Sequence, residues 1–154
     1  MVLVQRNSNE SLQLAICVEV NTIRKYIYIG IGGGTGAMLR VLAKAIPFEK
    51  VAGITIYNTL FVNLVGCFAL AFFLSLALEL FEIDAEIRLG IATGLMGGLT
   101  TFSTLCKEVH TLMLGHSVVV GIYYGVISIL AGISCVYLGI IATRQYIAMR
   151  ERHI

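Results

Sequence analysis

The chain has 154 residues, of which 58% are hydrophobic and 13% charged, and its formal net charge is +2. Because a soluble domain carries about 25% charged residues, this chain has too little polar surface to stay in water, and we expect a single-domain membrane protein. The small net charge, without any basic block, argues against a nucleic-acid-binding protein.

The predicted fold is all-α, with membrane-spanning helices that each need about 20 mainly apolar residues. A head of mixed character, residues 1–23, is compatible with disorder, a short interfacial helix or a misplaced start, and we assign it no function. Four apolar runs follow, at about 26–45, 51–78, 89–114 and 118–143. We therefore expect a four-helix transmembrane domain at 24–145 and a polar tail at 146–154.

The third run contains a predicted break. Paired glycines precede four hydroxyl side chains there: Gly97 and Gly98, then Thr100, Thr101, Ser103 and Thr104. Hydrocarbon tolerates no unpaired backbone polar groups, so irregular backbone at that depth survives only where protein buries it or a water-filled path adjoins it. The sequence therefore predicts an interrupted third helix beside an ion or solute path.

Glycines recur four residues apart in three of the runs: Gly32 and Gly36; Gly90, Gly94 and Gly98; and Gly121 and Gly125. Small residues at this spacing let helix backbones approach closely in lipid. Four short helices cannot enclose a polar path alone, so we expect an oligomer.

Basic residues predict the orientation in the membrane. With four spans, both termini and the second loop share a side, and that side holds most of them: Arg6, Arg24, Lys25, Arg88, Arg144, Arg150 and Arg152. The other side holds Arg40, Lys44, Lys50 and Lys107. Because basic loops stay in the cytoplasm, this asymmetry favours cytoplasmic termini.

Two polar residues in the first half of the chain have alternative interpretations. Arg40 is either an interfacial anchor or a structural residue at the mouth of a pathway. Asn63, deep in an uncharged run, is either a link between helices or a pore donor. The glycine-rich segment 32–37 also fits a dinucleotide-binding fingerprint, but no acidic residue follows at 55–58, so close helix packing explains it better.

The second half of the chain holds similar ambiguities. Phe102 is either a packing residue or a ring whose positive edge meets an anion. Tyr124, Ser128 and Gly132 share one helix face, where hydroxyls either line a pore or bond to their own backbone. Cys106 and His110 are spaced for a thiolate–imidazole pair, although a histidine facing headgroups is commoner.

No enzyme pattern is present. The four cysteines have no C-x-x-C spacing, and we expect Cys17, Cys67, Cys106 and Cys135 to serve in neither a metal site nor a disulfide. The sequence also lacks a nucleophile elbow, paired catalytic carboxylates and an H-E-x-x-H motif.

Three motifs taken together resemble the CrcB (Fluc) fluoride channel family. They are GGGTGA at 32–37 with Arg40, NTLFVNLVG at 58–66 and GLMGGLTTFST at 94–104. Their order and spacing match across about 28–143, and the third motif is the most specific.

The resemblance implies a passive, fluoride-selective channel of the cell membrane that lets fluoride leave the cytoplasm. It also implies an antiparallel dimer with two pores, each lined by both subunits. A structural sodium ion would be held at the break by the backbone carbonyls of Gly97 and Thr100, an arrangement that suits a hard monovalent cation. No other cofactor is implied.

The resemblance also assigns roles to single residues. Arg40 and Glu108 would be structural. The fluoride path would consist of an amide, a ring edge and hydroxyls that replace the water around the anion: Asn63, Phe102, Ser103, Thr104, Tyr124 and Ser128.

Three positions depart from the family pattern. Leu105 stands where a second phenylalanine is usual, Asn58 replaces a glycine, and Gly132 replaces a hydroxyl. Some members of the family are two-gene pairs in which one subunit has drifted. The alternative hypothesis is therefore that this chain conducts only with a homologous, oppositely oriented partner.

Two other classes of function were compared with the channel. A scaffold subunit would have no use for a broken helix and its hydroxyls. A proton-coupled exporter of the small-multidrug type generally has an acidic residue in its first span, and 26–45 contains none. The sequence favours the channel.

Overall fold

The computed structural model describes residues 8–45, 56–80 and 83–152. All of its elements are helices: α1 Ser8–Lys44, α2 Ile56–Glu79, α3 Ala85–Leu89, the π-helix η1 Gly90–Leu95, α4 Met96–Leu99, α5 Phe102–Gly115 and α6 Val118–Glu151. The predicted all-helical character is confirmed for these residues.

Three helical stretches are long and apolar enough to cross a membrane: Ile56–Glu79, Ala85–Gly115 and Val118–Glu151. They match the second, third and fourth apolar runs, except that 51–55 lies outside the described residues. The first run lies within α1, which begins at Ser8 and so includes much of the predicted head. Most of the predicted tail likewise continues α6, which ends at Glu151.

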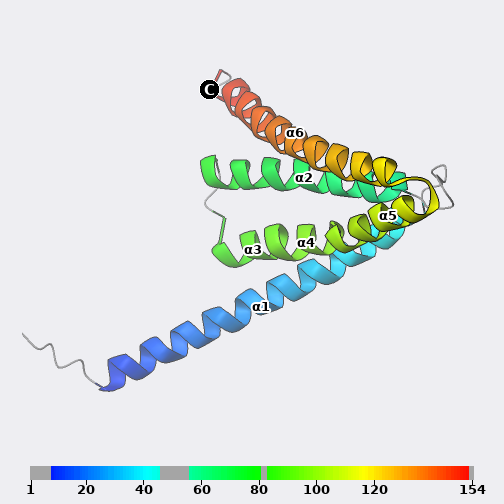
Figure 1. The fold of residues 1–154 in the computed structure, drawn as a ribbon. Helices are drawn as coiled ribbons and strands as arrows, with labels where there is room; N and C mark the ends of the chain where they lie inside the picture. Colours follow the sequence, from blue (N-terminus) through cyan, green and yellow to red (C-terminus); the bar gives the residue numbers. More distant parts are fainter. Residues whose placement is uncertain (1–7, 46–55, 81–82, 153–154) are drawn as a thin grey trace, which may run out of the picture.

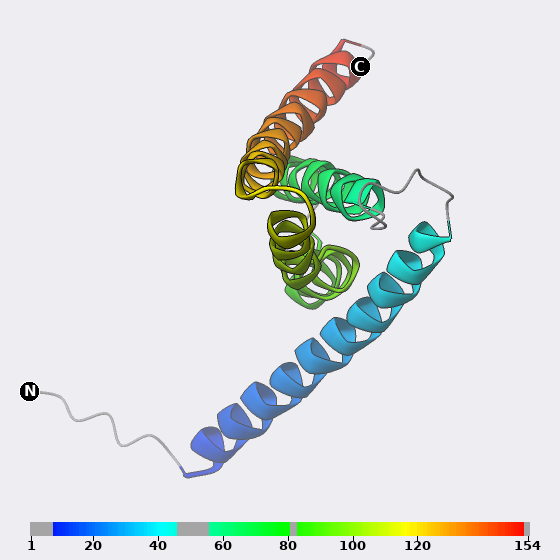
Figure 2. The ribbon, with the colours of Figure 1, turned by 45° about the vertical axis from the view of Figure 1, so that its right-hand side comes forward.

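The helices form two packed groups. α1 packs on α3, η1 and α4, whereas α6 packs on α2 and α5 (Figure 1 and Figure 2). The start of α1, the start of α3 and the end of α6 lie toward one end of the bundle, and α5 lies toward the other (Figure 1). The N-terminal part of α1 extends beyond the other helices (Figure 2).

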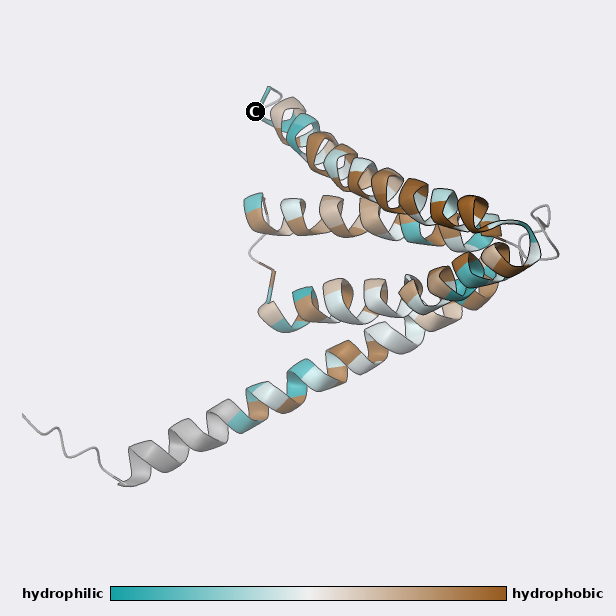
Figure 3. Ribbon diagram, viewed as in Figure 1, coloured by the Kyte–Doolittle hydropathy of each residue, from teal (hydrophilic) through white to brown (hydrophobic). Residues whose placement is uncertain are grey.

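Much of the apolar surface faces outward. Apolar residues run along most of α6 (Figure 3), and its Val119, Tyr123 and Ile133 side chains are 74%, 67% and 62% exposed. Such a surface needs lipid or another subunit to cover it.

The predicted close approach of helices at glycines is confirmed for all but Gly125, where an added Cβ would be in ordinary contact with the Val109 side chain at 3.5 Å. A Cβ on Gly36 would overlap the Leu95 carbonyl oxygen and lie 2.8 Å from the Leu99 nitrogen. A Cβ on Gly94 would lie 2.6 Å from the Ile29 carbonyl oxygen. We call this contact of α1 with η1 and α4 the glycine seam; its members are Gly32, Gly36, Gly90, Gly94 and Gly98.

Side chains fill most of the other interface, although Gly121 of α6 also approaches the α5 backbone, where an added Cβ would lie 2.8 Å from the Val109 carbonyl oxygen. Leu105 and Leu112 of α5 and Tyr124 of α6 form a small buried core, on which Ile56 and Leu60 of α2 also pack. This core fixes α5 against both α2 and α6. The residues after 101 are thus held mainly by side chains, whereas the glycine seam is mainly a contact between backbones.

Candidate functional site

Thr100 and Thr101 separate α4 from α5 and have extended backbone, with φ/ψ of −77°/157° and −148°/116°. The Thr100 hydroxyl donates back to the Met96 carbonyl at 2.9 Å. The Thr101 hydroxyl accepts the Thr104 N–H at 3.2 Å and so caps the start of α5. We call Thr100 and Thr101 the junction.

Arg40 of α1 reaches the last carbonyls before the junction. Its Nε donates to the Leu99 oxygen at 2.9 Å, and its Nη2 donates to the Thr100 oxygen at 2.9 Å and also to the Gly98 oxygen. These are carbonyls that a helix end leaves without intrahelical partners. These bonds favour the interpretation of Arg40 as a structural residue over that of an interfacial anchor.

Asn63 of α2 holds the junction from the other side. Its Oδ1 accepts the Thr101 N–H at 2.8 Å, and its Nδ2 donates to the Thr101 carbonyl at 3.1 Å. The interpretation of Asn63 as a link between helices is confirmed. The amide has a second N–H, which these bonds leave available to another acceptor.

A groove of about 590 Å³ runs beside the junction. Five of the predicted site residues line it, three from the fluoride path and two from the sodium site: Asn63, Phe102 and Ser128, with Gly97 and Thr100. Two of the three departures from the family pattern, Leu105 and Gly132, line it as well, whereas Asn58 does not. The structure therefore brings together residues from α2, α4, α5 and α6 that the motifs singled out separately.

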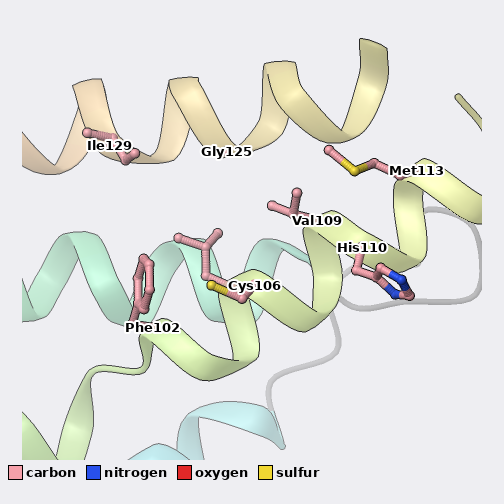
Figure 4. A pocket seen from close by; sticks show the side chains of 8 residues that line it. Phe102, Cys106, Val109, His110, Met113, Gly125 and Ile129 are labelled. Carbon is pink, nitrogen blue, oxygen red and sulfur yellow. The ribbon is translucent and has the colours of Figure 1, made fainter. Parts of the chain in front are cut away.

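A second, smaller cavity of about 220 Å³ lies between α5 and α6 (Figure 4). Phe102, Leu105 and Ile129 line both this cavity and the groove, so Phe102 stands where the two join. Its ring is 74% exposed. Cys106 and His110 also line the cavity, but their side chains point away from each other, so they form no pair (Figure 4).

Glu108 lies outside the groove in a buried hydrogen-bonded cluster. Its Oε1 accepts from the Thr59 hydroxyl at 2.5 Å and its Oε2 from the Tyr124 hydroxyl at 2.8 Å. Glu108 is 5% exposed, and the two bonds offset the cost of burying its carboxyl group. Tyr124 is committed to this cluster and does not line the groove.

The remaining hydroxyls bond locally. The Ser128 hydroxyl donates to the Tyr124 carbonyl at 2.7 Å, as one interpretation of the hydroxyl face expected. Ser103 and Thr104 are both within hydrogen-bond distance of the Thr101 hydroxyl, at 3.2 Å and 3.0 Å, and neither lines the groove.

Two residues that hold the site together were given no role from the sequence. Thr101 is the cap of α5, and its place before Phe102-Ser103-Thr104 is a local signal that could have identified it. Thr59 binds Glu108 across 49 positions, and no local pattern predicts such a contact.

The sequence profile of the family described as CrcB-like protein, Camphor Resistance (CrcB), matches residues 27–140. The chain belongs to the CrcB-like family. The family resemblance drawn from the three motifs is thereby confirmed.

Several relatives of this CrcB-like chain are named for an activity. The fluoride-specific ion channel FluC of Trichormus variabilis is 40% identical over 80% of this chain and 90% of its own length. FluC 1 of Staphylococcus epidermidis is 38% identical over 75% of this chain and 93% of its own. FluC 1 of Moorella thermoacetica is 34% identical over 77% and 85%. These relatives are thus ion channels and not enzymes. Membership of the family, together with the three apolar helical stretches of this chain, indicates a membrane protein.

Proposed function

We propose that this chain is a subunit of a fluoride-selective channel that lets fluoride leave the cytoplasm passively across the cell membrane. The observation that carries the proposal is the groove beside the junction, which gathers Asn63, Phe102 and Ser128 in a chain related to fluoride-specific channels.

The proposed mechanism is the replacement of water around a small, strongly hydrated anion. The second N–H of Asn63 and the positive edge of the Phe102 ring contact the anion along the groove. Ser128 contributes once its hydroxyl turns from the Tyr124 carbonyl toward the groove. Ser103, Thr104 and Tyr124 join the path once their hydroxyls turn from the Thr101 hydroxyl and from Glu108 toward it. Each contact must be strong enough to dehydrate fluoride and weak enough to release it.

The proposed assembly is an antiparallel dimer in which each chain crosses the membrane four times, with α1 as the first span and the junction as the break of the third. A groove open on one chain and an exposed Phe102 ring fit a path that two chains complete. α3, which contains Arg88, and the end of α6, which follows Arg144, lie toward the same end of the bundle, and we place that end in the cytoplasm.

The groove also supports the heterodimer as an alternative. Leu105 and Gly132 line it at positions where the family has a ring and a hydroxyl. A homodimer would lack these two anion contacts in both pores. A related, inverted partner that retains them would supply them to the paired channel.

Gly97 and Thr100 fit the implied sodium ion. Both line the groove at the end of α4, where helix carbonyls carry partial negative charge. The Thr101 N–H, which would pair with the Gly97 carbonyl in a continuous helix, is bonded to Asn63 instead. The Thr100 carbonyl accepts from Arg40 with one of its two lone pairs. Bound sodium would supply a fixed charge that joins the two chains.

Fluoride efflux from liposomes tests the proposal, with chloride as the control anion. Purified wild-type protein should release fluoride and retain chloride. Phe102→Ile should lower the fluoride flux by about tenfold or more, since it removes the ring edge at the join of the two cavities. Tyr137→Ile is the matched control, because Tyr137 is an exposed ring on α6 that lines neither cavity. An unchanged flux in Phe102→Ile would contradict the assigned path.

A further inference from the structure

The junction is held by two side chains from different helices. Arg40 of α1 takes the carbonyls of Gly98, Leu99 and Thr100, and Asn63 of α2 takes both backbone groups of Thr101. Together they bind the polar groups that an interrupted helix exposes at its broken end.

The contact on the Arg40 side depends on the shape of the guanidinium group. Two of its nitrogens, held in one plane, reach three consecutive carbonyl oxygens. A lysine ammonium is a point charge on a flexible stem and cannot present this fixed fork. Gly36, one turn before Arg40, brings α1 against Leu95 and Leu99, so the glycine seam sets the distance from which Arg40 reaches the junction.

The charge of Arg40 has a second consequence at the groove. The carbonyl oxygens at the end of α4 carry partial negative charge, and Thr100, which follows α4, lines the groove. Left bare, these oxygens would repel an anion in the groove. The guanidinium group offsets their partial charge where it binds them.

We propose that Arg40 is a positioning residue for the anion path. Its guanidinium fork holds the junction from the α1 side and fixes the direction in which α5 begins. It thereby places Phe102 at the join of the groove and the smaller cavity. For the effect of Arg40 on fluoride flux, the inference rests on the proposed function. The effect of Arg40 on the structure of the junction does not depend on which ion the protein conducts.

Arg40→Lys and Arg40→Ala test this role in the full-length protein in liposomes. Both should lower fluoride efflux by about tenfold or more, the effect of losing one hydrogen bond to a charged group. Both should also speed backbone hydrogen exchange in the peptide covering 98–104, where the Thr101 N–H is otherwise bonded. Exchange in α6 should not change. Arg24→Lys and Arg24→Ala are the matched controls, since Arg24 is an exposed arginine of the same helix.

A double-mutant cycle separates positioning from general destabilisation. If Arg40 and Asn63 act on one junction, Arg40→Lys combined with Asn63→Ala should lose less flux than the product of the two single losses. Independent effects would multiply, and that result would overturn the shared role.

Two further results would overturn the proposal. One is wild-type efflux together with wild-type exchange in Arg40→Lys, which would show that the fork is not required. The other is lost efflux with unchanged exchange at 98–104. Arg40→Lys decides the matter if Arg40→Ala fails to assemble. A wild-type protein without fluoride flux would contradict the proposed function, and the exchange measurement would still test the junction.

Discussion

The segments before and after the junction pack by different means. Before it, η1 and α4 meet α1 through glycines and backbone atoms, so the helices touch without side chains between them. After it, α5 meets α2 and α6 mainly through side chains such as Leu112 and the Glu108 cluster, with one close backbone approach at Gly121, and cavities remain beside it. The difference teaches that the glycine seam provides a fixed support. The helices after the junction, which pack mainly through side chains, leave the space that the proposed path needs.

Filling the glycine seam should have the largest effect. In Gly36→Leu the new side chain would meet Leu95 and Leu99 backbone, which cannot move aside as a side chain can. We expect a loss of about 3 kcal/mol or more of unfolding free energy, measured by thermal or denaturant unfolding in detergent, and loss of assembled protein.

The seam offers its own control. Gly34 lies on the same helix with nothing within 4 Å of an added Cβ. Gly34→Ala should leave the unfolding free energy unchanged or raise it by up to about 1 kcal/mol, since alanine favours helix. Equal losses in the two variants would contradict a specific seam.

Removing the buried Glu108 carboxylate tests the packing of the helices after the junction. Glu108→Ala leaves the Thr59 and Tyr124 hydroxyls without their acceptor, and should cost about 2–3 kcal/mol of unfolding free energy. Glu151→Ala, at the exposed end of α6, should change it by less than about 0.5 kcal/mol. A Glu108→Ala protein as stable as wild type would show that side-chain bonds do not hold these helices.

The proposed sodium site lies at the end of α4, next to the glycine seam. Replacing sodium by an equal concentration of N-methylglucamine should lower the melting temperature of the detergent-solubilised protein by a few degrees, as expected when a ligand of the native state is withdrawn. The protein should regain its melting temperature when sodium is restored. Identical melting in both salts would count against a bound sodium ion.

The smallest effect on the unfolding free energy is expected from a substitution at Leu105 of α5. Leu105→Phe adds a ring where the groove and the smaller cavity provide room. We expect a change in unfolding free energy of less than about 1.5 kcal/mol and a higher fluoride flux in liposomes. A flux no higher than that of wild type would indicate that one ring edge in each chain suffices.

The sequence predicted features that depend on local pattern. Apolar length located two helices, predicted at 51–78 and 118–143 and observed at Ile56–Glu79 and Val118–Glu151. Spacing alone identified the glycines of the seam. The π-helix at Gly90–Leu95 and the extension of α1 back to Ser8 were not predicted, since ends and helix type depend on small local preferences.

Contacts between distant residues were beyond the reach of sequence patterns. The Thr59–Glu108 bond and the reach of Arg40 to Thr100 span 49 and 60 positions, and each depends on how whole helices pack. The family resemblance implied that Tyr124 lies on the path, yet in the structure its hydroxyl binds Glu108. Spacing placed Tyr124 and Ser128 on one turn but could not tell which neighbour each would meet.

The most direct test of the central claim compares fluoride and chloride efflux from liposomes that contain the wild-type protein, alone and together with an inverted relative. The account predicts rapid fluoride release with chloride retained in at least one of the two preparations. Equal release of both anions, or no fluoride release from either preparation, would contradict it.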